Sequence, residues 1–225
     1  MSLLISVIIP ALNEETGIAR TIGSAADAEG VEVIVADGGS ADDTMKVAAS
    51  LGAKIIHAKR GRASQMNAGA DAATGDALLF LHADSVLPIG YDRHIRAALT
   101  DDSVVAGAFG LRIDSEMRGL RLIERLANWR TRRFSLPYGD QGIFVRRGVF
   151  HEVGGFPDTP IMEDFEMMRR LRRRGRVVLA PASVTTSARR WQRHGVVRTT
   201  LINQMVIAGY IIGVSPASLR RLYWK

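Results

Sequence analysis

The sequence predicts an α/β protein with a doubly wound, mostly parallel central sheet and flanking helices. Short apolar runs alternate with segments of helical length from residue 4 to about residue 84, a pattern typical of strand–helix–strand units. The runs carry few polar interruptions, as expected for strands buried on both faces of a parallel sheet. The 225 residues, 47% hydrophobic and 24% charged, suit one large domain or one domain with an appendage.

The first half of the chain follows this alternation closely. The expected strands are residues 4–10, 32–37, 54–57 and 77–81, and the expected helices between them are residues 13–28, 43–51 and 63–73. Pro10 is expected to end the first strand, because proline cannot donate to the ladder of a central strand. Asn13 is expected to cap the first helix, since its side chain accepts from free backbone N–H groups.

The second half is less regular. The expected helices are residues 91–99, 118–134, 148–153 and one from residue 163, and the expected strands are 104–113, 142–145 and 177–179. No stretch rich in glycine, serine or proline divides the chain. We therefore expect one domain over residues 1–195. Residues 196–225 are expected to form a helical tail that packs on this domain, on a dimer partner or on a membrane surface.

Composition narrows the class of partner. The net charge is +7, with a pI of about 10.3, which favours phosphate-bearing partners such as nucleotides or anionic lipids. The arginines are not interleaved with aromatic residues, so nucleic acid is not expected. The absence of cysteine excludes disulfides and thiolate metal sites and fits a cytoplasmic protein. Neither the G-x-G-x-x-G nor the P-loop pattern is present, which argues against a dinucleotide oxidoreductase or a P-loop nucleotidase.

Acidic residues follow several of the expected strands or begin a helix. Four of them are expected to lie at one edge of the sheet: Glu14, Asp37, Asp84 and Asp164. Ligands of open α/β sheets bind beyond the carboxyl ends of the strands, so this edge is the predicted site. Each residue alone could equally be a helix or turn cap. Asp84 and His82 follow the most apolar strand and suit a cation that carries phosphates, or a sugar hydroxyl.

Six segments, in a fixed order, carry a family resemblance: Ser6–Glu14, Val33–Thr44, Asn67–Gly69, Gly75–Asp76, His82–Asp84 and Met162–Asp164. With this set the chain resembles family-2 glycosyltransferases, which implies the GT-A (nucleotide-diphospho-sugar transferase) fold. The L-H-A-D sequence in place of D-x-D is similar to a bacterial subgroup often called "transferase 2, radical-SAM/selenodomain-associated". Asn67 is expected to serve helix packing or a local hydrogen bond.

The resemblance implies a nucleotide-sugar donor site. Pro10, Asn13 and Glu14 would line the nucleoside pocket, with Glu14 accepting from the ribose hydroxyls. Asp37 would read the base, since a carboxylate can accept a ring N–H of uracil or guanine. Arg62 would face the pyrophosphate or the nucleoside, as a guanidinium suits phosphate oxygens. A solvated loop arginine is the alternative for Arg62.

The resemblance also implies roles for His82, Ala83 and Asp84, which stand at the D-x-D position. Asp84 would hold Mg²⁺ or Mn²⁺ on the diphosphate of the donor. Histidine replaces the first aspartate of the motif, so His82 would contact the donor sugar or reach the metal through water. His194 is a candidate for a further metal ligand, and a surface position is the alternative.

The acceptor side is implied by the same resemblance. Glu163 and Asp164 match the family's E-D motif, and Asp164 would be the general base of an inverting displacement. Asp140 and Gln141 would lie in an acceptor-side loop, or simply form a turn before a strand. The Q-x-x-R-W pattern of processive members is absent, which favours transfer of a single sugar. A protein that binds nucleotide sugars without turnover is the alternative.

The tail combines apolar and basic residues. Residues 201–214 are mostly apolar but are shorter than the roughly 20 residues that span a bilayer. Arginine, tyrosine, tryptophan and lysine follow, which suits a membrane interface. Together with the basic helix expected over 118–134, the tail could dock the enzyme on the anionic inner membrane near a lipid acceptor. Packing on the domain or in a homodimer is the alternative.

Overall fold

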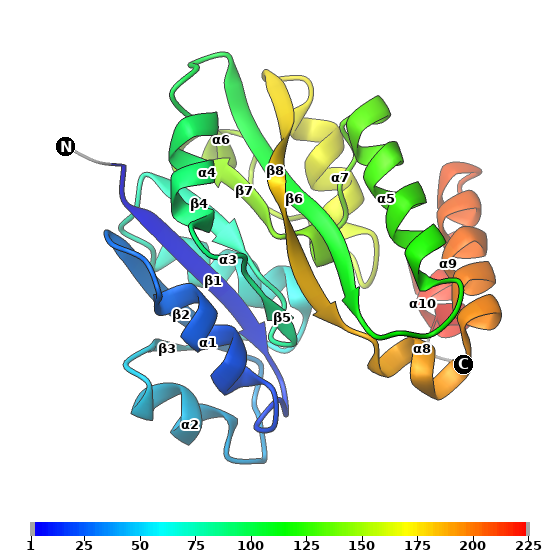
Figure 1. The fold of residues 1–225 in the computed structure, drawn as a ribbon, viewed down its shortest axis with the longest axis horizontal. Helices are drawn as coiled ribbons and strands as arrows, with labels where there is room; N and C mark the ends of the chain where they lie inside the picture. The colour runs from blue at the N-terminus through cyan, green and yellow to red at the C-terminus, as the bar shows by residue number, and fades with distance from the viewer. Residues whose placement is uncertain (1–2, 224–225) are drawn as a thin grey trace.

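The computed structural model describes residues 3–223. Within them an eight-stranded mixed sheet has the order β3-β2-β1-β4-β7-β6-β8-β5 (Figure 1). The strands are β1 (Ile5–Ala11), β2 (Val31–Asp37), β3 (Lys54–His57), β4 (Ala77–Phe80), β5 (Ser85–Val86), β6 (Val104–Asp114), β7 (Ile143–Arg146) and β8 (Arg176–Ser187). The first four strands pair in parallel, so their carboxyl ends share one edge.

The second half of the sheet changes direction at β7. This strand lies antiparallel between β4 and β6, whereas β8 runs parallel to β6. The two-residue β5 pairs antiparallel with the end of β8, with Ser85 opposite Thr186. Because β5 follows β4 directly, this pairing brings the end of β8 to the carboxyl edge of the parallel strands.

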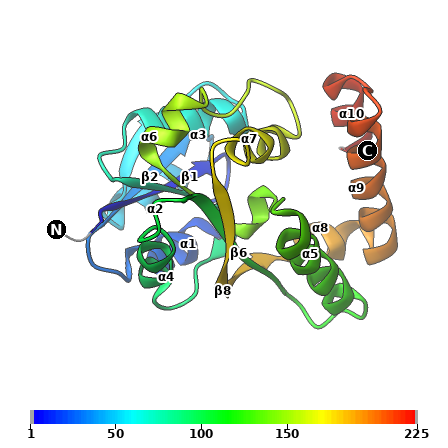
Figure 2. The same cartoon turned by 90° about the horizontal axis from the view of Figure 1, so that it is seen from above.

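Helices cover both faces of the sheet (Figure 2). They are α1 (Ile18–Ala26), α2 (Thr44–Ser50), α3 (Arg62–Asp71), α4 (Tyr91–Ala98), α5 (Leu120–Phe134), η1 (Gly139–Gln141), α6 (Arg147–Glu152), α7 (Glu163–Leu171), α8 (Arg189–His194), α9 (Val196–Ile211) and α10 (Pro216–Tyr223). Residues of α1, α2 and α4 share one apolar cluster, and residues of α3, α6 and α7 share another. Helices therefore cover both faces of the sheet, so polar side chains that could bind a ligand are found at the ends of the strands.

Two expectations about the first loop are wrong. The first helix begins at Ile18 and not at Asn13, and Gly17 is its N-cap. Asn13 has a φ of 55°, and its Oδ1 atom accepts from the Ala41 backbone N–H at 2.9 Å. Asn13 therefore ties the loop after β1 to the loop after β2. The first strand also continues through Pro10 to Ala11, because β4 pairs with it only as far as Ile8 and leaves no ladder bond for Pro10 to donate.

The last strand was expected over residues 177–179 but extends for 12 residues, Arg176–Ser187. Its second half is rich in serine and threonine, so apolar periodicity does not reveal it. The pairing with β6 continues to Asp114 opposite Ser187, which stabilises the polar half through backbone hydrogen bonds. The short strand β5 was not expected either.

The C-terminal helices α8, α9 and α10 follow β8 at the side of the molecule (Figures 1 and 2). The tail meets the domain at Met162, where an apolar cluster includes Val206 and Leu219. Phe165 and Tyr210 also meet there, with ring centroids 5.7 Å apart. Between residues 3 and 223, no helix has the length and apolar character needed to cross a bilayer.

Candidate active site

The expected general base lies where the E-D segment meets the loop before β7. Asp164 stands in the first turn of α7, and its Oδ2 atom accepts from the Gly139 backbone N–H at 2.8 Å. A side chain at Gly139 would bring Cβ to 2.9 Å from His82 Nε2 and to 3.5 Å from Asp164 Oδ2. The Gly139 backbone therefore lies against both side chains, and a Cβ there would crowd His82 Nε2.

His82 is a neutral group in this site. Burial, reinforced by the positive charge of Arg62, lowers the pKa of His82 to about 3. The Nε2 atom is buried and finds no hydrogen-bond partner within residues 3–223. A buried nitrogen without a hydrogen-bond partner destabilises the folded protein unless a ligand or a water molecule binds to it. The imidazole is therefore available to bind a donor substrate or a cation.

Arg62 provides positive charge between the donor and acceptor sides. It begins α3, and its Nη1 atom lies 3.6 Å from Oε1 of Glu163, whose side chain is almost fully buried. Loss of hydration lowers the pKa of Arg62, but the negative charges of Glu163, Asp164 and Asp84 raise it, and the net shift is upward. Arg62 therefore lies among the acidic residues of the predicted site. The Arg62 side chain is also 50% exposed, so its role at the phosphates stays a prediction.

Asp140 and Gln141, both expected in an acceptor-side loop, have different surroundings. Burial raises the pKa of Asp140 to about 6, with Arg130 and Asp164 nearby. Gln141 is completely buried, and its amide donates to the Phe109 carbonyl oxygen at 3.0 Å. Its Oε1 atom accepts from Thr131, Arg130 and the Tyr138 backbone. The side chain of Gln141 is thus committed to holding the loop, and a contact of this loop with the acceptor stays a prediction.

The expected nucleoside residues lie at the carboxyl ends of β1 and β2 and in the loop after β1. Asp37 is 1% exposed and accepts from the Gly39 and Ser40 backbone N–H groups, so it holds the turn after β2. Pro10 stands in register with Ala36 on β2, and Gln65, which sequence reasoning missed, donates to the carbonyl oxygens of Ala11 and Ala36. This buried glutamine fastens the ends of both strands beneath the nucleoside edge.

Arg189 is the main feature that sequence reasoning missed. Its Nη2 atom lies 2.8 Å from Glu14 Oε2 and 3.4 Å from Asp84 Oδ2. One guanidinium therefore joins the carboxylate expected at the ribose to the carboxylate expected at the metal. Ala83, between His82 and Asp84, is buried and accepts from Thr21 Oγ1 at 2.8 Å.

The side chains at the D-x-D position are chemically suited to a divalent cation. A cation that bridges diphosphate oxygens needs only one or two protein ligands. The Asp84 carboxylate and the neutral, unpartnered His82 imidazole can supply them, and imidazole suits Mn²⁺ better than Mg²⁺. Across the described part of the chain, no three histidine or acidic side chains cluster as a preformed metal site. His194 instead lines a small cavity with Arg190 and Tyr223.

The end of the tail reaches Arg190 and the charged residues around Asp164. Tyr223 stacks on the Arg190 guanidinium, 3.4 Å from the ring centroid, and its carbonyl oxygen accepts from Arg190 Nη2 at 3.0 Å. Burial raises the pKa of Tyr223, and the charges of Arg190, Arg62, Asp140 and Asp164 act on its phenol. A residue 59 positions after Asp164 (223 minus 164) thus joins the same region, which no local pattern indicates.

Asn67 has the packing role expected for it. Its Nδ2 atom donates to the Phe156 carbonyl oxygen and its Oδ1 atom accepts from the Phe156 N–H, both at 2.9 Å.

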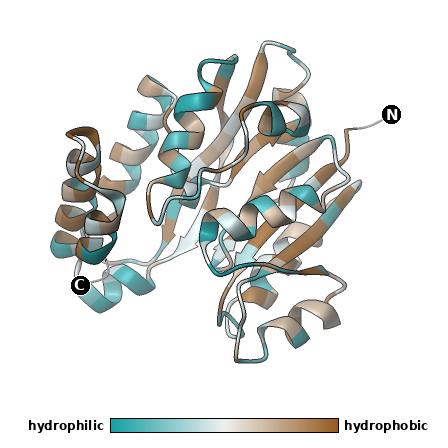
Figure 3. Ribbon diagram, turned by 180° about the vertical axis from the view of Figure 1, so that it is seen from behind, coloured by the Kyte–Doolittle hydropathy of each residue, from teal (hydrophilic) through white to brown (hydrophobic). Residues whose placement is uncertain are grey.

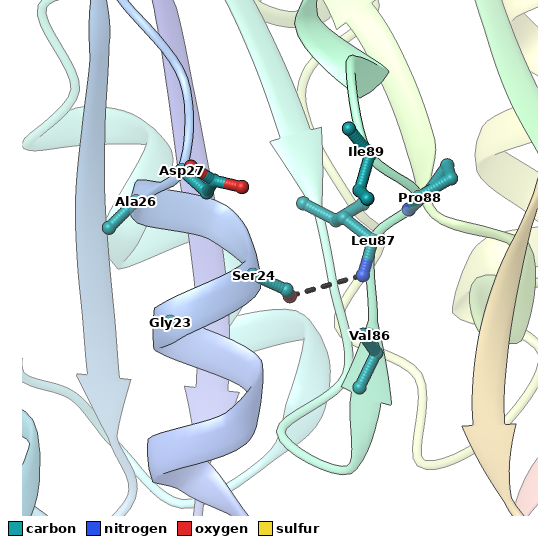
Figure 4. Close-up of a pocket in the computed structure, with 8 residues that line it drawn as sticks. All are labelled: Gly23, Ser24, Ala26, Asp27, Val86, Leu87, Pro88 and Ile89. Carbon is teal, nitrogen blue, oxygen red and sulfur yellow. Dashed lines mark hydrogen bonds between the residues drawn. The ribbon is translucent and has the colours of Figure 1, made fainter.

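Away from the acidic edge, an open hollow lies between α1 and the segment after β5 (Figure 4). Ser24 Oγ there accepts from the Leu87 backbone N–H at 3.1 Å. None of the residues lining this hollow belongs to the predicted site.

Comparison with known proteins gives the family. Residues 6–156 match the profile of Glycosyl transferase family 2. PGL/p-HBAD biosynthesis glycosyltransferases of Mycobacterium bovis and Mycobacterium tuberculosis are 32% identical over 170 residues, which cover 68% of this chain. The chain spans 63% of the length of these curated relatives.

Solved structures give the fold. Staphylococcus aureus TarS 1–349 superposes with a TM-score of 0.68 at 16% identity, over 98% of this chain and 69% of that one. The mannosyltransferase PcManGT from Pyrobaculum calidifontis, in complex with GDP-Man and Mn²⁺, has a TM-score of 0.67 at 20% identity, over 99% and 68% of the two chains. Glucosyl-3-phosphoglycerate synthase from M. tuberculosis, with Mn²⁺, UDP and glucosyl-3-phosphoglycerate, has a TM-score of 0.61 at 22% identity, over 90% and 79%. The curled, mostly parallel sheet is thus the expected GT-A fold, and the chain belongs to glycosyltransferase family 2.

Proposed function

We propose that the protein is an inverting glycosyltransferase that moves one sugar from a UDP- or GDP-type nucleotide sugar to a hydroxyl acceptor. The observation that carries this proposal is the convergence of His82, Asp84, Arg62 and Asp164 at one edge of the sheet. The acceptor class is a sugar, a lipid or a small molecule. Within the family, the L-H-A-D segment supports membership of the "transferase 2, radical-SAM/selenodomain-associated" subgroup.

The donor is held on one side of this edge. Glu14 accepts from the ribose hydroxyls, Asp37 from the base, and Arg62 faces the phosphates. Asp84, with His82, would hold the divalent ion, and that ion would neutralise the charge of the leaving nucleotide. Two structural neighbours carry Mn²⁺ together with UDP or GDP-Man, which supports a divalent ion here and leaves Mg²⁺ as the alternative.

Asp164 acts on the acceptor. Its Oδ2 atom takes the proton of the acceptor hydroxyl as the oxygen attacks the anomeric carbon in line with the departing diphosphate. The C–O bond to the diphosphate breaks as the new bond forms, so the configuration inverts. The Gly139 N–H donates to the same Oδ2 atom, which fixes the direction of the carboxylate.

Replacing Asp164 with asparagine tests the proposal. Asparagine keeps the shape and an acceptor oxygen for Gly139 but cannot take a proton. We expect the transfer rate to fall by about 10²- to 10⁴-fold, while nucleoside diphosphate affinity in calorimetry stays within about twofold. The control is Asp158→Asn, an exposed aspartate in the loop before α7.

The outcomes separate the alternatives. Transfer that survives in D164N would contradict the assignment of the base. A wild-type protein that binds UDP or GDP but transfers no sugar would favour the alternative, a nucleotide-sugar-binding protein without turnover. Binding of neither nucleotide, with Mn²⁺, Mg²⁺ or EDTA, would contradict both readings.

We also propose that the enzyme works on the cytoplasmic face of the inner membrane, as a peripheral protein. In this proposal residues 1–195 are the catalytic domain and residues 196–225 the tail, which faces lipid on its outer side as far as residue 223; residues 224–225 lie outside the described residues. Apolar side chains on α5 and α9 remain exposed beside arginines, which supports contact with an anionic leaflet. A homodimer through the same face is the alternative, and nucleic acid is not a partner in this proposal.

A further inference from the structure

Arg189 occupies the centre of the donor side, although no motif assigns it a role. It is the first residue of α8 and follows β8 after a single residue. Its guanidinium contacts two acidic side chains of different segments, Glu14 at 2.8 Å and Asp84 at 3.4 Å. The same Nη2 atom makes both contacts, so the arginine bridges the two carboxylates as a single cation.

The backbone on each side of this bridge is held independently of it. The Ser187 N–H donates to the Asp84 carbonyl oxygen at 3.2 Å, which fixes the end of β8 beside the D-x-D position. The Glu14 N–H donates to Thr44 Oγ1 at 2.8 Å, which fixes the loop after β1. Only the side chain of Arg189, which is 51% exposed, has to move for the bridge to open.

The bridge and the proposed donor complex need the same two carboxylates. The ribose hydroxyls would use the Glu14 carboxylate, and a divalent cation would use the Asp84 carboxylate. Arg189 holds Oε2 of the first and Oδ2 of the second. The donor also brings a negatively charged diphosphate, and a planar guanidinium pairs well with phosphate oxygens. Donor binding therefore offers Arg189 a new partner while it competes for the old ones.

We propose that Arg189 is an exchangeable counter-ion of the donor site. In the free protein it neutralises Glu14 and Asp84 and competes with a divalent cation for Asp84. When the nucleoside diphosphate binds, the guanidinium transfers to the diphosphate oxygens and releases both carboxylates. This inference rests on the proposed donor site, and it adds a residue and a competition that the family resemblance did not supply.

The substitution Arg189→Gln separates the two halves of the exchange. Removing the competitor should tighten the binding of Mn²⁺ alone, followed by electron paramagnetic resonance, by about two- to fivefold, the effect of a solvent-exposed ion pair. Removing the phosphate partner should weaken the binding of UDP or GDP in EDTA, followed by calorimetry, by about tenfold or more. The two affinities are thus expected to move in opposite directions.

The matched control is Arg193→Gln. Arg193 lies on the same helix α8 and is exposed, so its replacement removes the same charge without touching Glu14 or Asp84. Both affinities should stay within about twofold of the wild type. Thermal unfolding followed by circular dichroism checks that each variant is folded.

The possible failures are distinguishable. Unchanged Mn²⁺ and nucleotide affinities in R189Q would overturn the role of Arg189 while leaving the proposed function intact. A loss of Mn²⁺ affinity in R189Q would overturn the competition, because the arginine would then be supporting the cation. If the wild type binds no nucleotide under any condition, the proposed function fails, and the Mn²⁺ titration still decides whether Arg189 competes at Asp84.

Discussion

Asp140 is a partly buried aspartate in the short helix η1, near Asp164. Its Oδ1 atom is buried and has no hydrogen-bond partner in the described chain. Burial raises its pKa to about 6, opposed by the charge of Arg130 and aided by that of Asp164. The carboxyl therefore holds its proton in the folded state at a pH where the unfolded chain has lost it.

This shift makes the stability depend on pH. As pH rises from about 4, the unfolded pKa, to about 6, the folded state binds more protons than the unfolded state, so the free energy of unfolding falls. The slope is at most roughly 1.4 kcal/mol per pH unit. The Asp140→Asn variant lacks this titrating group, so its free energy of unfolding should not show this decrease. Between pH 4 and 6, urea unfolding should therefore show the stability of the variant rising relative to that of the wild type. Asp71→Asn, at an exposed aspartate of α3, should change the slope little; equal slopes in D140N and the wild type would contradict the shift.

At the scale of elements, small residues let helices approach the sheet. On α3, a Cβ at Gly69 would lie 2.4 Å from Ile8 Cγ2 on β1, whereas a Cβ at Gly23 on α1 would meet nothing within 4 Å. Both glycines stand inside helices and neither has a positive φ. Alanine is favoured over glycine in a helix at both positions, but only at Gly69 would its methyl group also clash with the sheet. Comparing the two substitutions therefore separates the cost of the clash from the helix preference of alanine.

We expect opposite effects from the same substitution at these two positions. Gly69→Ala should destabilise the protein by about 1–3 kcal/mol, because α3 must move away from β1. Gly23→Ala should stabilise it by up to about 1 kcal/mol, because alanine loses less backbone entropy and meets open space. Chemical unfolding measures both. A Gly69→Ala variant as stable as the wild type would contradict the close approach of α3.

At the scale of the whole molecule, exposed apolar residues gather on one pair of helices. Of the 12 large apolar side chains exposed in the described chain, all but Leu51 and Ile89 lie on α5, on α9 or just after α9. The two helices meet at their N-terminal ends, where Leu120 and Val196 share an apolar cluster. Figure 3 shows apolar segments on the C-terminal helices at the side of the molecule. An apolar surface beside arginines favours an anionic membrane.

Flotation with liposomes checks this docking. The wild type should float with anionic vesicles at low salt and lose binding at high salt, because ionic screening weakens the arginine contribution. Replacing Arg132 and Arg133 of α5 by glutamate should reduce flotation at least several-fold, at about 1 kcal/mol per basic residue near the surface. The same reversal at Arg172 and Arg173, which are exposed after α7, is the control. A stable dimer that never floats would favour the homodimer.

Much of the fold follows from local pattern. β3 was predicted with its observed bounds, and most other elements lie within a few residues of theirs, because apolar periodicity reports burial directly. The long strand β8 was missed beyond Leu179, since proline interrupts it at Pro181 and its last residues are mostly serine and threonine. The sequence predicts a helix that starts at Asn13 because asparagine is a common helix N-cap. The same side chain can instead accept from a backbone N–H of a neighbouring loop, and the sequence does not distinguish the two cases.

The succession of strands and helices and the acidic strand ends could be predicted from the sequence, because each depends on residues close together in the chain, and the family resemblance rests on short segments in a fixed order. Tertiary structure alone decided which distant side chains meet. The pairing of β5 with β8 brings Arg189 to Glu14 and Asp84, and the packing of α9 and α10 brings Tyr223 onto Arg190. These contacts join residues as many as 175 positions apart, and a separation of that length leaves no periodic trace in the sequence.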